Sequence, residues 1–169
     1  MIRSERLDLV SLGLDLFRDI AARRLDAVES ALDVAVPPAF LDAVPAEMRI
    51  EQLERDPTEL PWLARAIVLR AERRVVGAAG FHAPPDERGR AELGYEIASA
   101  DRRRGFAREA VVALMAWAVA HGEVRAFVAS IAPGNAASRG LVASLGFVRV
   151  GEQIDPIDGL EWVYERVAG

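Results

Sequence analysis

Residues Glu92–His121 read ELGYEIASADRRRGFAREAVVALMAWAVAH and join a strand-like segment to a long apolar helix through three consecutive arginines. From Glu92 to Ala98, apolar residues alternate with polar or small ones, as in a strand with one buried side. From Ala107 onward, apolar residues recur at steps of three and four, which predicts a helix buried on most sides and stopped at Gly122. This strand-to-helix junction is where we expect the functional site.

The junction itself, Arg102-Arg103-Arg104-Gly105-Phe106-Ala107, has the features of an anion-binding loop. The first N–H groups of a helix have no partner within the helix, and the helix dipole is positive at that end. Gly105 allows the backbone to approach a ligand closely, and arginines supply forked donors that suit phosphate. We therefore predict that this loop binds a diphosphate group.

The common nucleotide-binding motifs do not describe this loop. The dinucleotide-binding fingerprint requires G-x-G-x-x-G, which this loop does not contain. The P-loop requires a lysine, and this chain has none. The loop instead resembles the acetyl-CoA-binding motif of the GNAT acyltransferases, Gln/Arg-x-x-Gly-x-Gly/Ala, with Arg102, Gly105 and Ala107 at the defined positions. Downstream, Asn135-Ala136-Ala137-Ser138 and Leu145-Gly146-Phe147 resemble the Asn-x-x-Ser/Ala and Leu-Gly-Phe segments of the same family.

The opening residues Ser4-Glu5-Arg6-Leu7-Asp8-Leu9 and the triplet Leu93-Gly94-Tyr95 are similar to the ribosomal-protein alanine N-acetyltransferase branch of that family. The resemblance implies one domain over residues 1–169 with an α+β (α/β mixed) fold. Its central sheet would be mixed, mostly antiparallel, of about seven strands flanked by helices, with a splayed strand pair forming the coenzyme A slot. Local patterns predict strands at Leu7–Val10, Leu63–Arg70, Arg74–Phe81, Val124–Ile131, Phe147–Ile154 and Leu160–Val167, and helices at Ala46–Arg55 and Ala136–Leu145.

The resemblance also implies an acetyl-CoA-dependent N-acetyltransferase that acts directly on a primary amine. The backbone around Ile97, Ala98 and Ser99 would bind pantetheine and polarise the thioester, and Arg102–Ala107 would bind the pyrophosphate. Asn135 would contact pantetheine and Ser138 would reach the sulfur, although Asn135 also suits a helix N-cap and Ser138 an ordinary first-turn position. Since the chain has no cysteine, we expect direct attack rather than a cysteine-linked acyl-enzyme.

A general base is expected because the attacking amine must be neutral. At pH 7, an α-amino group is about a tenth neutral, whereas a lysine side chain is neutral to roughly 0.04%. Glu92 is the first candidate, Glu96 on the same strand face is the second, and His82 is the third; each could instead be an ordinary solvated side chain. Val142 occupies the position where many members of the family carry a tyrosine that protonates the thiolate.

Composition excludes several other classes of function. A formal net charge of −5 argues against a nucleic-acid-binding surface. Two histidines, no cysteine and no H-E-x-x-H motif argue against a metal site. No apolar run approaches the ~20 residues of a membrane span, and the first residues are unlike a signal peptide. We therefore expect a cytoplasmic protein, and the exclusive use of arginine among its basic residues suggests a bacterial source.

Two other functions remain open. A non-catalytic acyl-CoA-binding regulatory module would keep Arg102–Ala107 but need no base, and in a nucleotide-binding protein ATP would compete with coenzyme A. For the enzyme, the expected partners are acetyl-CoA and an amine acceptor, either a protein N-terminus or a small amine such as a polyamine or antibiotic. The acidic charge slightly favours cations. An apolar sheet edge near the C-terminal hairpin could support a homodimer.

Overall fold

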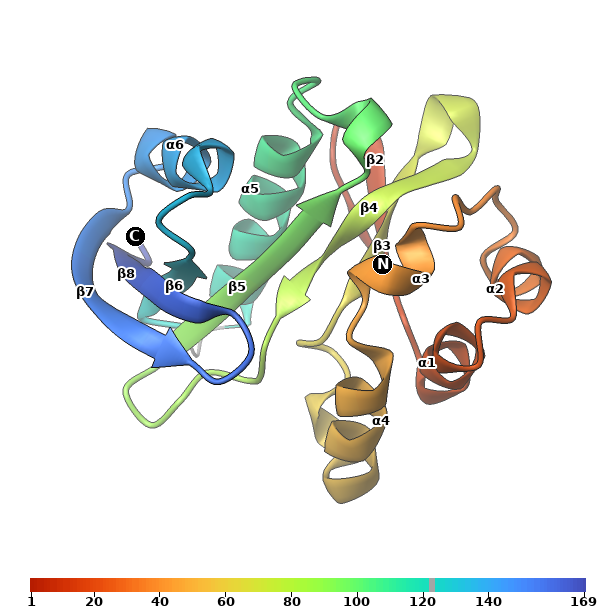
Figure 1. Ribbon diagram of the computed structural model, residues 1–169, viewed down its shortest axis with the longest axis horizontal. Coiled ribbons are helices and arrows are strands. Elements are labelled where there is room, and N and C mark those ends of the chain that lie inside the picture. Colours follow the sequence, from red (N-terminus) through yellow and green to blue (C-terminus); the bar gives the residue numbers. More distant parts are fainter. Residues whose placement is uncertain (122–123) are drawn as a thin grey trace.

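The computed structural model describes residues 1–121 and 124–169 and contains one open sheet with helices on both faces (Figure 1). The strand order is β1-β2-β3-β4-β5-β6-β8-β7, and within the described residues β5–β6 is the one parallel pair. The strands are β1 (Ile2–Arg3), β2 (Leu7–Ser11), β3 (Arg65–Leu69), β4 (Arg74–Phe81), β5 (Arg90–Ile97), β6 (Ala126–Ile131), β7 (Val148–Asp155) and β8 (Gly159–Val167). The helices are α1 (Leu14–Ala21), α2 (Leu25–Leu32), α3 (Phe40–Ala43), α4 (Ala46–Arg55), α5 (Phe106–Ala120) and α6 (Ala136–Ser144), with short 3-10 turns at Pro57–Glu59, Arg70–Glu72 and Ser99–Asp101.

The sheet has a hydrophobic core on each face because its central strands alternate their side chains. Along β3, Ile67 and Leu69 join the core beneath α5, whereas Ala66 and Val68 join the core beneath α1–α4. This arrangement confirms the predicted α+β fold with a mixed, mostly antiparallel sheet. The eighth strand, β1, is only two residues long, too short for a periodic pattern to reveal it.

Helix α5 is less buried than its sequence predicts. One side packs on the sheet through residues such as Ala110 and Leu114, which are fully buried. The opposite side carries Val112 and Val119, which are 41% and 48% exposed. The prediction of burial on most sides was therefore wrong, because α5 is an outer layer and apolar residues also occupy its solvent face (Figure 1). The predicted stop at Gly122 lies outside the described residues.

Strands β5 and β6 separate after a short region of pairing. They pair only over Arg90–Glu92 and Ala126–Val128. Beyond these residues β5 and β6 no longer pair with each other, and β5 pairs with β4 while β6 pairs with β8. This separation confirms the predicted splayed pair. Since parallel strands end at the same edge of a sheet, the helices that follow them, α5 and α6, both begin near the resulting gap (Figure 1).

Two further surface features bear on the expectations above. Edge strand β7 exposes Val148, Val150 and Ile154, which form the apolar sheet edge expected near the C-terminal hairpin; the homodimer stays a prediction. Among the described helices, none combines the length and apolar character that crossing a membrane requires.

Candidate active site

The loop between β5 and α5 adopts the geometry expected of an anion-binding turn. Gly105 is the N-cap of α5 with φ +81°, and no side chain caps the helix there. A Cβ at Gly105 would lie 3.4 Å from Arg6 Nη2, an ordinary contact. Backbone conformation rather than crowding therefore requires glycine at this position. Because no side chain caps the first turn, its N–H groups are available to an anion.

A buried carboxylate organises this loop. Asp101, only 3% exposed, accepts hydrogen bonds from the two Nη atoms of Arg74 at 2.6 and 2.7 Å and from Arg104 Nη1 at 2.9 Å. These arginines, Arg74 foremost, outweigh burial and hold the pKa of Asp101 below its ordinary value. Arg104 also lies 3.4 Å from Glu72, so its charge is already matched by carboxylates.

The three consecutive arginines therefore have different environments. Arg102 Nε donates to the Ile97 carbonyl at 3.0 Å, which ties the loop to the end of β5. Arg104 pairs with Asp101. Arg103, with φ +62°, makes no side-chain hydrogen bond or ion pair within residues 1–121 and 124–169. Of the three predicted phosphate donors, Arg103 is thus the one whose guanidinium is not already engaged by the protein.

The N-terminal segment braces the start of α5. Glu109 accepts hydrogen bonds from Ser4 Oγ at 2.6 Å and from the backbone N and Nε of Arg6, each at 2.7 Å. Burial raises the pKa of Glu109, but these hydrogen bonds outweigh it and the net pKa is lowered. Arg6 Nη1 also donates to the Arg104 carbonyl at 3.1 Å, and its guanidinium lies 4.7 Å from the centre of the Phe106 ring. Arg6, from the N-terminal segment, thereby holds the backbone of the loop at Arg104 and the side chain of Phe106 in place.

A cavity of about 330 Å³ lies against β4 and β5, near α3 and α4. Small residues form much of its wall, and charged or titratable side chains contribute the rest; the lining comprises Ala43, Pro45, Arg49, Ala64, Ala78, Ala79, Gly80, Phe81, His82, Gly94, Tyr95, Glu96 and Asp158. A smaller cavity of about 180 Å³ is lined by Ala98, Ser99 and Arg102 of the loop and shares Glu96 with the larger one. The loop and the larger cavity therefore meet at the end of β5.

Of the three base candidates, the structure brings His82 and Glu92 together. Glu92 accepts a hydrogen bond from Ser130 Oγ at 2.6 Å and lies 3.7 Å from His82 Nδ1. His82 and Ser130 hold the pKa of Glu92 below its ordinary value despite its burial. His82 lines the larger cavity, and its Nε2 would lie 2.8 Å from a Cβ at Gly94. Only a glycine at position 94 leaves room for the imidazole there.

The other predicted base, Glu96, stands apart from this pair. It lines both cavities and lies 3.9 Å from Arg102, with more than half of its side chain exposed. Glu96 thus contributes negative charge where the cavities meet.

The beginning of α6 follows β6, the second of the two splayed strands, whereas the arginine loop follows β5. Asn135 Oδ1 accepts a hydrogen bond from Ser138 N at 3.1 Å, so Asn135 is the helix N-cap. Val142 is fully buried in the core. The Tyr95 hydroxyl is buried without a hydrogen-bond partner in the described part of the chain. Burial raises the pKa of Tyr95, and the nearby Ser138 hydroxyl partly offsets this effect, although their geometry falls short of a hydrogen bond.

Residues 6–148 match the family model described as an acetyltransferase (GNAT) domain. The chain belongs to the GNAT acetyltransferase family. Enzymes of this family use acetyl-CoA as acyl donor. Two similar curated relatives are known. The uncharacterized N-acetyltransferase YjdG of Bacillus subtilis is 33% identical over 82 residues, which are 48% of this chain and 49% of the relative. The uncharacterized N-acetyltransferase p20 of Bacillus licheniformis is 33% identical over 104 residues, which are 62% of this chain and 54% of the relative. The matches span about half the length of these relatives.

Solved structures of acetyltransferases share the fold over nearly the whole chain. A ribosomal-protein-S5-alanine acetyltransferase from Vibrio fischeri has a TM-score of 0.69 at 18% identity, covering 98% of this chain and 95% of that one. The microcin C7 self-immunity acetyltransferase MccE, in complex with acetyl-CoA and AMP, has a TM-score of 0.68 at 19% identity, with coverage of 96% and 93%. The resemblance to the GNAT family is confirmed, and acetyltransferases named for ribosomal proteins are among its structural neighbours.

Several residues that shape this GNAT site had not been predicted. Arg6 lay in a segment noted for its family resemblance, but nothing local linked it to Glu109, over a hundred residues away. No local pattern indicated the contact between Arg74 and Asp101, which lie 27 residues apart. Arg49 had a usable signal, since it falls on the buried stripe of α4 with Ala46 and Leu53, where a charged residue is unusual.

Proposed function

We propose that this protein is an acetyl-CoA-dependent N-acetyltransferase that transfers the acetyl group directly to a primary amine in the cavity of about 330 Å³. The observation that carries the proposal is the position of the His82–Glu92 pair. The imidazole lines a cavity that meets the β5–α5 loop at Glu96. Family membership supports the reaction, and this juxtaposition supports the placement of donor and acceptor.

The uncapped start of α5 fits a diphosphate. Its first N–H groups, with Arg103, would bind the pyrophosphate of coenzyme A. The pantetheine arm would follow Ile97, Ala98 and Ser99 into the gap between β5 and β6, near Asn135. The bound thioester supplies an activated acetyl group; the protein supplies donors that hold it and polarise its carbonyl.

His82 is the group proposed to take the proton from the acceptor amine. Its ring lines the cavity, whereas Glu92 lies behind it and would hold the Nδ1 side of the imidazole, leaving Nε2 to act as base. As the amine nitrogen bonds to the acetyl carbon, its proton passes to Nε2 and the C–S bond breaks. Glu96 would attract the ammonium form of the acceptor, which would release one proton to solvent and become a neutral amine before the attack.

The departing thiolate needs a proton, and Tyr95 with Ser138 is proposed to supply it. Both lie beside the gap in which pantetheine would end, and the Tyr95 hydroxyl has no protein partner within the described residues. Tyr95 would thus take over the role of the tyrosine that is absent at position 142.

The test combines coenzyme binding with turnover. Acetyl-CoA or coenzyme A at a hundred times Kd should stabilise the protein by about 2.7 kcal/mol, as measured by thermal unfolding. ATP should not, and Gly105→Glu should abolish the shift. Gly151→Glu is the matched control, since Gly151 is exposed and nothing lies within 4 Å of an added Cβ.

For turnover, His82→Gln should lower kcat by about 10²–10⁴ while keeping the coenzyme-induced shift. The other histidine, His121, is exposed at the end of α5, and His121→Gln should leave kcat unchanged. Coenzyme binding without turnover on a broad panel of amines would contradict the enzyme and favour a binding module.

A further inference from the structure

The larger cavity contains a buried cation that the proposed chemistry does not use. Arg49, from α4, lines this cavity and is only 6% exposed. Its Nη1 donates to Gln52 Oε1 and to the His82 carbonyl, both at 2.7 Å. Its Nε is buried without a hydrogen-bond partner, and within the part of the chain that the structure describes the guanidinium forms no ion pair. Arg49 therefore carries both unmatched charge and unused donors.

An unpaired buried charge is costly, so buried guanidinium groups are normally matched by an anion. Burial lowers the pKa of Arg49, and Glu59 offsets this only in part. Glu59 is held instead by the Gln52 amide, which lies between it and Arg49. The guanidinium of Arg49 therefore lies in the wall of the cavity without a carboxylate to pair with among the described residues. An anionic group of a ligand would complete the arrangement.

The position of Arg49 relative to His82 restricts which ligand this is. The guanidinium is bonded to the backbone carbonyl of the same residue whose ring is the proposed base. A ligand that reaches both must carry its amine and its anion only a few bonds apart. The remaining charged lining residues, Glu96 and Asp158, are acidic and suit an ammonium group. The cavity therefore presents complementary charges to a zwitterion.

From this juxtaposition we infer that the acceptor is a small α-amino acid or a close analogue, with its carboxylate bound by Arg49 and its amine directed to His82. This inference rests on the proposed acetyl transfer and names the substrate class of that site. The bond changes are those given above, and the carboxylate stays bound to Arg49 throughout. A polyamine lacks the anion, and a peptide N-terminus has a neutral amide in its place. The volume of about 330 Å³ lies within the range of small-molecule sites.

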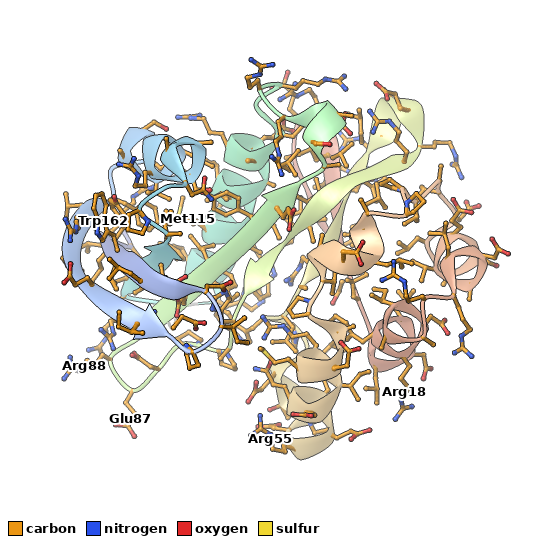
Figure 2. The ribbon with its side chains drawn as sticks, viewed as in Figure 1. Arg18, Arg55, Glu87, Arg88, Met115 and Trp162 are labelled. Atoms are coloured by element: carbon orange, nitrogen blue, oxygen red, sulfur yellow. The ribbon has the colours of Figure 1, made fainter. Side chains whose placement is uncertain are left out.

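The test compares each α-amino acid with its own α-carboxamide, which keeps the side chain and replaces the carboxylate with a neutral group. Because the carboxamide also lowers the pKa of the amine, the informative quantity is the change in the acid-to-amide ratio between wild type and variant, measured at one pH. With acetyl-CoA, kcat/KM is measured for both members of each pair with the wild-type protein and with the variants, and the acid-to-amide ratio is formed for each. Arg49→Met should lower this ratio by about ten- to a hundred-fold relative to wild type, the range of a charge-assisted hydrogen bond. Arg55→Met is the matched control and should keep it, because Arg55 is exposed at the outer end of α4 (Figure 2).

Calorimetric titration of the same pairs into the protein–coenzyme A complex separates this inference from the proposed function. Acid binding without acetylation would overturn the proposed function and support the carboxylate site. Acetylation with carboxamides or polyamines binding as tightly as the amino acids would overturn the inference alone. A lowered unfolding midpoint in Arg49→Met with an unchanged ratio would make Arg49 a structural residue. If Arg49→Met does not fold, Arg49→Lys should give an intermediate ratio, since lysine keeps the charge but not the fork.

Discussion

At the scale of single residues, the Tyr95 hydroxyl shows how stability and function can be separated. A buried hydroxyl without a partner weakens the folded state, because it has lost its hydrogen bonds to water. Tyr95→Phe should therefore leave the free energy of unfolding unchanged or raise it by up to about 1 kcal/mol. If Tyr95 protonates the thiolate, kcat should nevertheless fall by about ten-fold or more.

Urea unfolding and steady-state kinetics on the same preparation measure both effects. Phe127→Leu in the core is a useful contrast, since it should cost stability through lost packing. Full turnover by Tyr95→Phe would show that the hydroxyl takes no part in the reaction.

Residues whose role follows from backbone geometry could be predicted from sequence. Gly105 at the helix start and Asn135 as a cap both express local rules, and both are found where expected. The position of His82 beside Glu92 depends on strand pairing between β4 and β5, which brings residues ten apart together. Local patterns ranked it third because they could not show which polar residue faces the cavity.

At the scale of elements, the β5–α5 loop depends on a carboxylate that lies outside the recognised motif. Asp101→Asn would remove the buried one of the two carboxylates that pair with both Arg74 and Arg104, leaving them with Glu72. We expect a loss of about 1–3 kcal/mol in the free energy of unfolding, less than for a fully buried pair because both arginines are partly exposed. The KM for acetyl-CoA should rise as well, since the loop is no longer held in shape.

Asp33→Asn is the matched control. Asp33 pairs with Arg73 at 2.7 Å, but its side chain is 90% exposed, and such surface pairs contribute little. Chemical denaturation with coenzyme titrations would compare the two variants. Equal stability and equal KM in Asp101→Asn and wild type would contradict the role given to Asp101.

For elements with a strong hydrophobic period or clear end signals, the observed bounds match those predicted from the sequence closely. Helix α4 and strand β4 have the predicted bounds, and α6 begins after its predicted cap. Burial was harder to predict, because an apolar residue in a helix pattern does not reveal whether a second layer covers it. For this reason the sequence pattern placed Val112 and Val119 of α5 in a buried stripe, although both are exposed.

At the scale of the whole molecule, the strand order could be expected only through family resemblance. Local alternation predicts strands, but it does not say which strands become neighbours. Contacts between distant segments, such as Arg6 with Glu109 or Arg49 with the His82 carbonyl, were beyond reach for the same reason. These contacts complete the candidate site.

The short pairing of β5 with β6 leaves few backbone hydrogen bonds between two units of the sheet, although one hydrophobic core cluster continues across both. Strands β1–β5 form one unit, and β6–β8 with α6 form the other; within the described residues, the strand pairing across the seam joins Arg90–Glu92 to Ala126–Val128. Amide hydrogens of the smaller unit should exchange with solvent through sub-global opening rather than complete unfolding. A coenzyme bound in the seam would contact both units and slow that exchange, so that the donor substrate would also hold the two units of the sheet together.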